Sequence, residues 1–383
     1  MPGQQLEKPH VPERNVSLDA LRVFCMFLIV LGHAIIHGQV LESLAPRSLN
    51  SYLVNVMRAF LSVHVDCFVM LSGYFLCTHT VRLKKAVSLW IQALFWSLLP
   101  YLLLCAGGAV TFQWSALAKA CLPFTQRRYW FVTAYLLLYL LTPFLNAAIH
   151  SMRQRQHAAF LAAFFVVYIA LQNVFFWEKF TSMEEIDPLL FVFLYVLAAY
   201  FRLYSPRRTR KCLLCVMIAL CLFAAAWKIV IPELTVKIAG RAMGADIFLT
   251  NNSVTMILAA ACLFRLFEGL HISSWYVQQT VALLSQLTFG VYLIHDQPEV
   301  RELLWRQLVR PDRFAQSPFL AVILIGIAAA VFLICAALEF LRQRVFAVLS
   351  VQKLVSAAAE KAGAVGARLV RCVFRLEPDR EGQ

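Results

Sequence analysis

The chain has 383 residues, of which 61% are hydrophobic and only 15% charged, and its formal net charge is +14. Soluble domains of this size usually contain about 45–50% apolar and about 25% charged residues, so the composition argues against a soluble protein and for a polytopic membrane protein. The basic residues gather in short clusters between apolar runs, as in loops beside anionic lipid. This distribution argues against a nucleic-acid-binding protein.

Residues 1–17 are polar and lead into the first apolar run without a small-residue cleavage site. We therefore expect a cytoplasmic N-terminal segment over residues 1–17, followed by a first membrane span that is not removed as a signal peptide.

Ten windows of mostly apolar residues are long enough to cross about 30 Å of hydrocarbon as helices. They predict an all-α membrane domain over residues 18–341, with about ten transmembrane helices. The predicted spans are 18–38, 57–78, 86–108, 129–149, 158–177, 187–204, 212–232, 247–268, 280–297 and 318–341. Beyond them, residues 342–383 form a basic cytoplasmic tail, for which an amphipathic helix on the inner leaflet and a disordered segment are both compatible with the sequence.

Lysine and arginine residues gather in alternate loops, at 79–85, 150–157 and 202–211. With ten spans these loops lie on the same side as the N-terminus, and the positive-inside rule places that side in the cytoplasm. The opposite side includes the acidic segment 177–187. Both termini are therefore predicted to be cytoplasmic, although the basic residues between 301 and 313 would then lie outside.

The first span contains two side chains that are costly in lipid, Arg22 and His33. Eleven residues at about 100° each bring them to nearly the same face of a helix, about 16 Å apart along its axis. Asp19 is close enough in sequence to pair with Arg22. One interpretation is that Arg22 extends to the interface and His33 packs against a neighbouring helix. The other is a functional line from a cytoplasmic mouth to a buried base.

The second span, "HVDCFVMLSGYFL", carries a carboxylate at Asp66 that needs a cation or a hydrogen-bond donor. His33 on the adjacent span is the natural candidate, because a carboxylate that holds one imidazole nitrogen makes the other nitrogen a better base. Ser72 and Gly73 form a small-residue notch that permits close approach of a helix or ligand, and Tyr74 places a hydroxyl beside it.

Polar and aromatic residues also occur at the predicted outer surface. Tyr129 and Trp130 open the fourth span, where they are either interfacial anchors or an edge that binds sugar. His295 and Asp296 close the ninth span, where they are either ordinary interfacial residues or part of an acceptor mouth. The pair Cys212 and Cys215 has the CxxC spacing, but no second pair or histidine completes a site, so we predict no metal centre.

Four segments in this order resemble the membrane acyltransferase-3 family, in particular its branch of bacterial surface-polysaccharide O-acetyltransferases. They are "RNVSLDALRVFCMFLIVLGH", "HVDCFVMLSGYFL", "YWFVTAYLLLYLLTPFLN" and "FGVYLIHDQPEVR", spread over residues 14–301. The spacing of Arg22 and His33 matches the first-span motif of the family and is the most specific element of the resemblance.

The resemblance implies a multi-pass enzyme of the bacterial cytoplasmic membrane that uses cytoplasmic acetyl-CoA as co-substrate and acetylates a glycan hydroxyl, with no bound cofactor. His33 matches the catalytic histidine of the family and Arg22 its paired arginine. Arg14 matches the basic position before the motif, and Asp66 lies in the acidic segment of the second span. Expected partners are acetyl-CoA, a glycan or lipid-linked saccharide, and membrane lipid.

Two mechanisms and two rival functions stay open at this point. His33, oriented by Asp66, could act as general base for direct attack on the thioester while Arg14 and Arg22 hold the donor phosphates. Alternatively, His33 or Ser72 could carry the acetyl group covalently. The first rival function is a proton-coupled transporter or flippase of a lipid-linked saccharide, which would consume no acetyl-CoA. The second is a membrane scaffold, in which replacing Arg22 or His33 by alanine would change stability but no chemical product.

Overall fold

The structure is a computed structural model that describes residues 14–80, 82–124, 128–174, 187–204 and 209–374. In these ranges the chain forms helices and no strand, so the predicted all-α class is confirmed. Most of the predicted N-terminal segment, all of the acidic segment 177–187 except Asp187, and the last tail residues, 375–383, lie outside the described residues. The α-helices are α1 (Val16–Ile36), α2 (Val40–Ser43), α3 (Leu49–Leu61), α4 (His64–Leu76), α5 (Leu83–Ala106), α6 (Trp114–Cys121), α7 (Trp130–Ser151), α8 (Gln154–Phe164), α9 (Leu171–Val174), α10 (Pro188–Tyr204), α11 (Arg210–Ala239), α12 (Val254–Glu268), α13 (Trp275–His295), α14 (Pro298–Glu302), α15 (Leu320–Val348) and α16 (Val351–Phe374). Two π-helices, η1 (Phe165–Ala170) and η2 (Leu303–Val309), and the 3-10 helix η3 (Pro311–Phe314) connect some of them.

Seven segments of the described chain are long and apolar enough to cross a membrane. They are α1, the nearly continuous pair α3–α4, α5, α7, α11, α13 and α15. This number confirms a polytopic membrane protein. The three other predicted windows correspond to α8–η1–α9, α10 and α12, so the figure of ten spans and the cytoplasmic position of both termini stay predictions.

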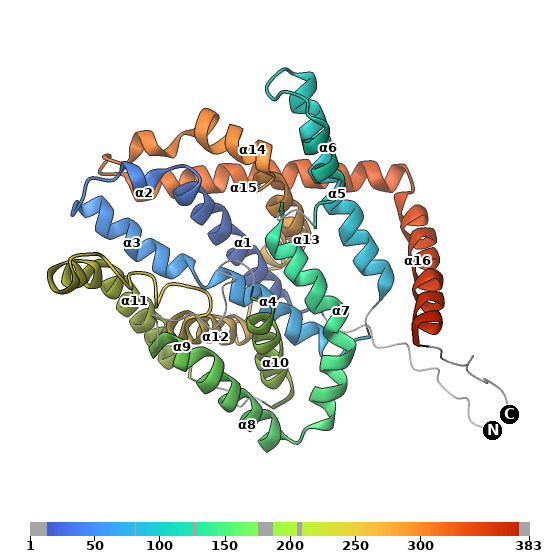
Figure 1. Cartoon of the computed structure of the whole chain (residues 1–383), viewed down its shortest axis with the longest axis horizontal. Coiled ribbons are helices and arrows are strands. Elements are labelled where there is room, and N and C mark those ends of the chain that lie inside the picture. The colour runs from blue at the N-terminus through green and yellow to red at the C-terminus, as the bar shows by residue number, and fades with distance from the viewer. Residues whose placement is uncertain (1–13, 81, 125–127, 175–186, 205–208, 375–383) are drawn as a thin grey trace.

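Helix α1 lies inside the bundle, where it packs against α4, α12, α13 and α15 (Figure 1). Its first turn is capped by the side chain of Asn15, which accepts a hydrogen bond from the backbone N–H of Leu18. Arg14 donates to the backbone carbonyl of Ala282 near the start of α13, and His33 lies beside His295 at its end. The two helices therefore run in the same direction, which brings their C-terminal ends together.

A glycine lets α4 approach α10 closely. A Cβ atom at Gly73 would lie 2.7 Å from the Cα atom of Tyr195, so no larger residue fits between the two backbones. The notch that the sequence predicted at Ser72 and Gly73 therefore receives a neighbouring helix on its glycine side.

A buried carboxylate joins α5, α13 and α15. The side chain of Glu339 is fully buried, and it accepts hydrogen bonds from Trp96 Nε1 at 2.8 Å and from Arg342 Nη2 at 2.5 Å. On its other side it packs against the backbone of Gly290 on α13, where any Cβ atom would overlap the Glu339 side chain. The sequence analysis did not identify this residue.

Residues of the predicted tail form the helix α16, which packs against α5 and α15 (Figure 1). Val351–Phe374 is thus helical, as one of the two interpretations of the tail predicted, whereas its place on the inner leaflet stays a prediction. Helix α15 also continues to Val348, seven residues beyond the predicted end of the last span at 341.

Candidate active site

A cavity of about 290 Å³ lies between α1, α4, α5, α7 and α13. Arg22 and His33, eleven positions apart on α1, both line it. The prediction that these residues share one face of the first span is therefore confirmed. The other polar side chains on its wall are His64, Ser72, Lys85, Ser285, Gln286 and Thr288, and the aromatic ones are Phe68, Trp130, Phe131, Tyr135, Phe289 and Tyr292.

The end of the cavity near the start of α1 is cationic. Arg22 and Lys85 both line it, and Arg22 Nη1 lies 3.0 Å from Asp19 Oδ1, as the sequence predicted. Asp19 also pairs with Arg14, whose Nε lies 2.5 Å from Asp19 Oδ2. The single carboxylate of Asp19 therefore pairs with two arginines, and the net positive charge that remains at this end of the cavity can attract an anionic ligand.

The far end of the cavity is built around His33, and the neighbouring histidine fixes its tautomer. His295 Nδ1 lies 2.6 Å from the backbone carbonyl oxygen of Val291, which can only accept, so Nδ1 of His295 carries a proton. In the neutral ring, Nε2 of His295 is then an acceptor, and it lies 3.0 Å from His33 Nδ1. Consequently His33 carries its proton on Nδ1 and presents an unprotonated Nε2.

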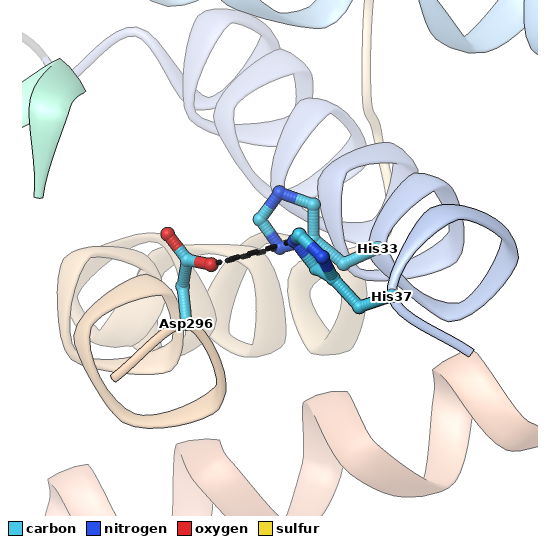
Figure 2. A group of neighbouring side chains, drawn as sticks. All are labelled: His33, His37 and Asp296. Carbon is cyan, nitrogen blue, oxygen red and sulfur yellow. Dashed lines mark ion pairs between the residues drawn. The ribbon is translucent and has the colours of Figure 1, made fainter. Parts of the chain in front are cut away.

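A carboxylate stands beside this pair of histidines. Asp296 Oδ1 lies 3.6 Å from His33 Nδ1 and 3.8 Å from His37 Nε2 (Figure 2). Arg301 Nη1 approaches the same oxygen at 3.4 Å, and its positive charge favours the ionised form of Asp296. The carboxylate strengthens the preference for a proton on His33 Nδ1, because that proton faces a negative oxygen.

The prediction that Asp66 orients His33 is wrong. Residues Val65, Phe68 and Ser72 of α4 line the cavity at helical spacing, whereas Asp66 is rotated about 100° away from Val65. Its side chain is fully buried, and neither carboxylate oxygen has a hydrogen-bond partner among the described residues. The carboxylate beside His33 comes from α13 instead of α4.

The other predicted site residues fall into two groups. Ser72 and Trp130 line the cavity. Arg14, Tyr74 and Tyr129 do not, because each is engaged elsewhere. Arg14 donates to Ser285 Oγ at 2.9 Å and joins α1 to α13, Tyr74 accepts from Arg202 at 3.2 Å, and the buried Tyr129 donates to the carbonyl of Leu293 at 2.9 Å. His295 lies behind His33, fully buried, rather than on an outer mouth.

Seven polar residues of the cavity wall are absent from the predicted site: His64, Lys85, Tyr135, Ser285, Gln286, Thr288 and Tyr292. Lys85 appeared in the sequence only as one of the loop charges that set orientation, although it belongs to the first turn of α5. His64 donates from Nδ1 to the backbone carbonyl of Leu61, so its Nε2 is also unprotonated. The position of His64 at the junction of α3 and α4 is the feature by which the sequence could have identified it as a site residue.

The comparisons with known proteins identify the family. The sequence profile of an acyltransferase domain matches residues 15–339, which is most of the chain. The chain belongs to the membrane acyltransferase-3 family. It is accordingly a membrane acyltransferase, and the expectation drawn from the four motifs is confirmed at this level. No curated protein and no solved structure matches the chain.

Proposed function

We propose that this acyltransferase moves an acetyl group from cytoplasmic acetyl-CoA to a hydroxyl of a bacterial cell-surface or lipid-linked polysaccharide, with His33 as general base. The observation that carries the proposal is the single cavity that joins a cationic end, at Arg22 and Lys85, to a histidine with an unprotonated Nε2. A thioester donor with an anionic nucleotide and a neutral hydroxyl acceptor require these two features.

The base assignment follows from the hydrogen bonds of the two histidines. Val291 holds the proton on His295 Nδ1, and His295 in turn accepts the proton on His33 Nδ1. Nε2 of His33 therefore stays free to accept a proton from the acceptor hydroxyl. His295 and Asp296 act through His33, so they are positioning residues.

The step we propose is a direct transfer. His33 Nε2 takes the hydroxyl proton while the hydroxyl oxygen attacks the thioester carbonyl carbon. The tetrahedral adduct then breaks its carbon–sulfur bond, and the departing thiolate of CoA receives the proton from the His33 imidazolium. One ester is formed, one thioester is consumed, and the histidine returns to its starting state.

The cationic end supports an anionic donor. Arg22 can make two parallel hydrogen bonds to a phosphate, and Lys85 of α5 adds a second positive charge to the cavity wall. The aromatic residues Trp130, Phe131 and Tyr135 on α7 offer flat apolar faces of the kind that stack on sugar rings. They support a glycan as the acceptor.

The test uses the purified protein in lipid nanodiscs with acetyl-CoA and a surface-glycan acceptor. Release of free CoA thiol together with a mass gain of one acetyl group on the glycan is the expected result. A transporter or flippase would move the saccharide without consuming acetyl-CoA. A covalent route through His33 or Ser72 would instead produce an acetylated protein when the acceptor is withheld, which mass spectrometry of the intact chain detects.

A further inference from the structure

A third histidine, His37, lies one turn beyond His33 on α1, and the direct transfer has no use for it. Its ring packs edge-on against that of His33, with the ring centroids 4.8 Å apart. Residues at positions i and i+4 of a helix project from the same face, so both imidazoles are directed at the end of α13. Asp296 lies there, across from both rings (Figure 2).

The donor atoms of these three side chains converge. His33 Nδ1, His37 Nε2 and Asp296 Oδ1 all lie within 4.8 Å of one another. Donors about 2.1 Å from one tetrahedral ion are separated by about 3.4 Å, so small rotations of side chains bring the three atoms to bonding distance. A water molecule can supply the fourth ligand, as in zinc sites with three protein ligands.

The chemistry of the donors selects the kind of ion. Imidazole nitrogens with one carboxylate oxygen suit Zn²⁺ and similar divalent transition metals, whereas Mg²⁺ and Ca²⁺ prefer oxygen ligands throughout. His37 also offers a route of entry, because its side chain is 27% exposed whereas that of Asp296 is only 6% exposed. The positive charge of Arg301 disfavours a bound cation, because Arg301 Nη1 lies 3.4 Å from the same Oδ1 of Asp296.

We propose that His33, His37 and Asp296 form a binding site for a divalent transition-metal ion such as Zn²⁺, and that the bound ion switches the enzyme off. An ion on His33 Nδ1 requires that nitrogen to be unprotonated, so the ring must carry its proton on Nε2 instead. Nε2 is then a donor and cannot accept the proton of the acceptor hydroxyl. The inhibition rests on the proposed function, whereas the binding of metal does not.

The binding experiment uses the full chain in nanodiscs, titrated with Zn²⁺ in a calorimeter and with Co²⁺ under visible spectroscopy. We expect one ion per chain, and the absorption bands of a four-coordinate Co²⁺ with nitrogen and oxygen ligands. The variant His37→Gln should weaken binding at least tenfold, and Arg301→Gln should strengthen it because the competing cation is gone. The control His79→Gln, at an exposed histidine, should leave binding unchanged. Equal affinity in His37→Gln and the native chain, or the absence of binding at millimolar Zn²⁺, would overturn the site.

The activity experiment separates this inference from the proposed function. If acetyl transfer occurs, Zn²⁺ should inhibit the native chain, and His37→Gln should keep its metal-free rate while resisting Zn²⁺ at concentrations that stop the native chain. Inhibition of both to the same extent would overturn the switch. If no acetyl transfer is seen with or without chelator, the proposed function fails, and the calorimetric and spectroscopic results still decide the metal site.

Discussion

His295 Nε2 lies 3.0 Å from His33 Nδ1, although the two residues are 262 positions apart in the sequence. The contact exists because α1 and α13 run side by side in the same direction and end together. A donor on His33 Nδ1 therefore meets an acceptor whose own tautomer is held by a backbone carbonyl. The reactivity of His33 depends on this second histidine.

The variant His295→Ala should lower kcat by about 10²-fold or more, because without the acceptor His33 no longer favours the tautomer that leaves Nε2 free. His295→Gln should keep more activity than His295→Ala, since the amide oxygen of glutamine can also accept from His33 Nδ1. Steady-state kinetics of both variants, compared at equal thermal stability, provide the check. Equal kcat in the two variants and the native chain would remove His295 from the mechanism.

Arg22→Ala and Lys85→Ala should each raise KM for acetyl-CoA by about tenfold while kcat changes little, because a lost charge-assisted hydrogen bond to phosphate weakens binding of the donor. Arg22→Lys should show a smaller rise, since it keeps the charge but loses the paired geometry. Lys84→Ala is the matched control, because Lys84 neighbours Lys85 in sequence but is not among the residues on the cavity wall. A KM unaffected by either substitution would place the donor elsewhere.

The sequence predicted the arrangement within helices better than the arrangement between them. The 3.6-residue period of an α-helix is enough to place Arg22 and His33 on one face, and both line the cavity. The sequence could not identify the carboxylate beside His33, because neighbouring spans in the chain need not present their polar residues to each other. Asp66 is on a helix that packs against α1, but its rotation about the axis of α4 directs it away from the cavity.

The same limit explains why the sequence misplaced one further residue and missed another. The sequence placed His295 at a surface, because it lies near the end of the predicted span 280–297, whereas packing of α1 and α13 buries it completely. Glu339 was not singled out at all, because its partners Trp96 and Gly290 come from distant parts of the chain. Local periodicity contains no information about such long-range contacts.

Asp66→Asn should fold and keep near-native kcat, because the carboxylate contacts neither His33 nor a hydrogen-bond donor among the described residues. Removing the potential charge of a fully buried carboxyl should leave the melting temperature unchanged or raise it. Asp296→Asn is the informative comparison. It should lower kcat, because without the carboxylate the preference for a proton on His33 Nδ1 is weaker. A folded but inactive Asp66→Asn would restore Asp66 as the orienting residue.

Glu339→Ala should destabilise the protein by about 3–5 kcal/mol, because it leaves the mostly buried guanidinium of Arg342 without its partner. Gly290→Ala should also destabilise it, although alanine is ordinarily the better helix former, since the added methyl group overlaps the Glu339 side chain. Thermal unfolding in detergent measures both. Unchanged melting temperatures would show that this junction of α5, α13 and α15 does not hold the bundle together.

The most direct test of the account is the release of CoA thiol from acetyl-CoA in the presence of a glycan acceptor, compared between the native chain and His33→Ala. We predict that the substitution lowers the rate by about 10²–10⁴-fold, the usual value of a general base, while the melting temperature stays near native. His79→Ala, at an exposed histidine, should retain the native rate. A folded His33→Ala protein that transfers acetyl groups at the native rate would contradict the assignment of His33 as the base.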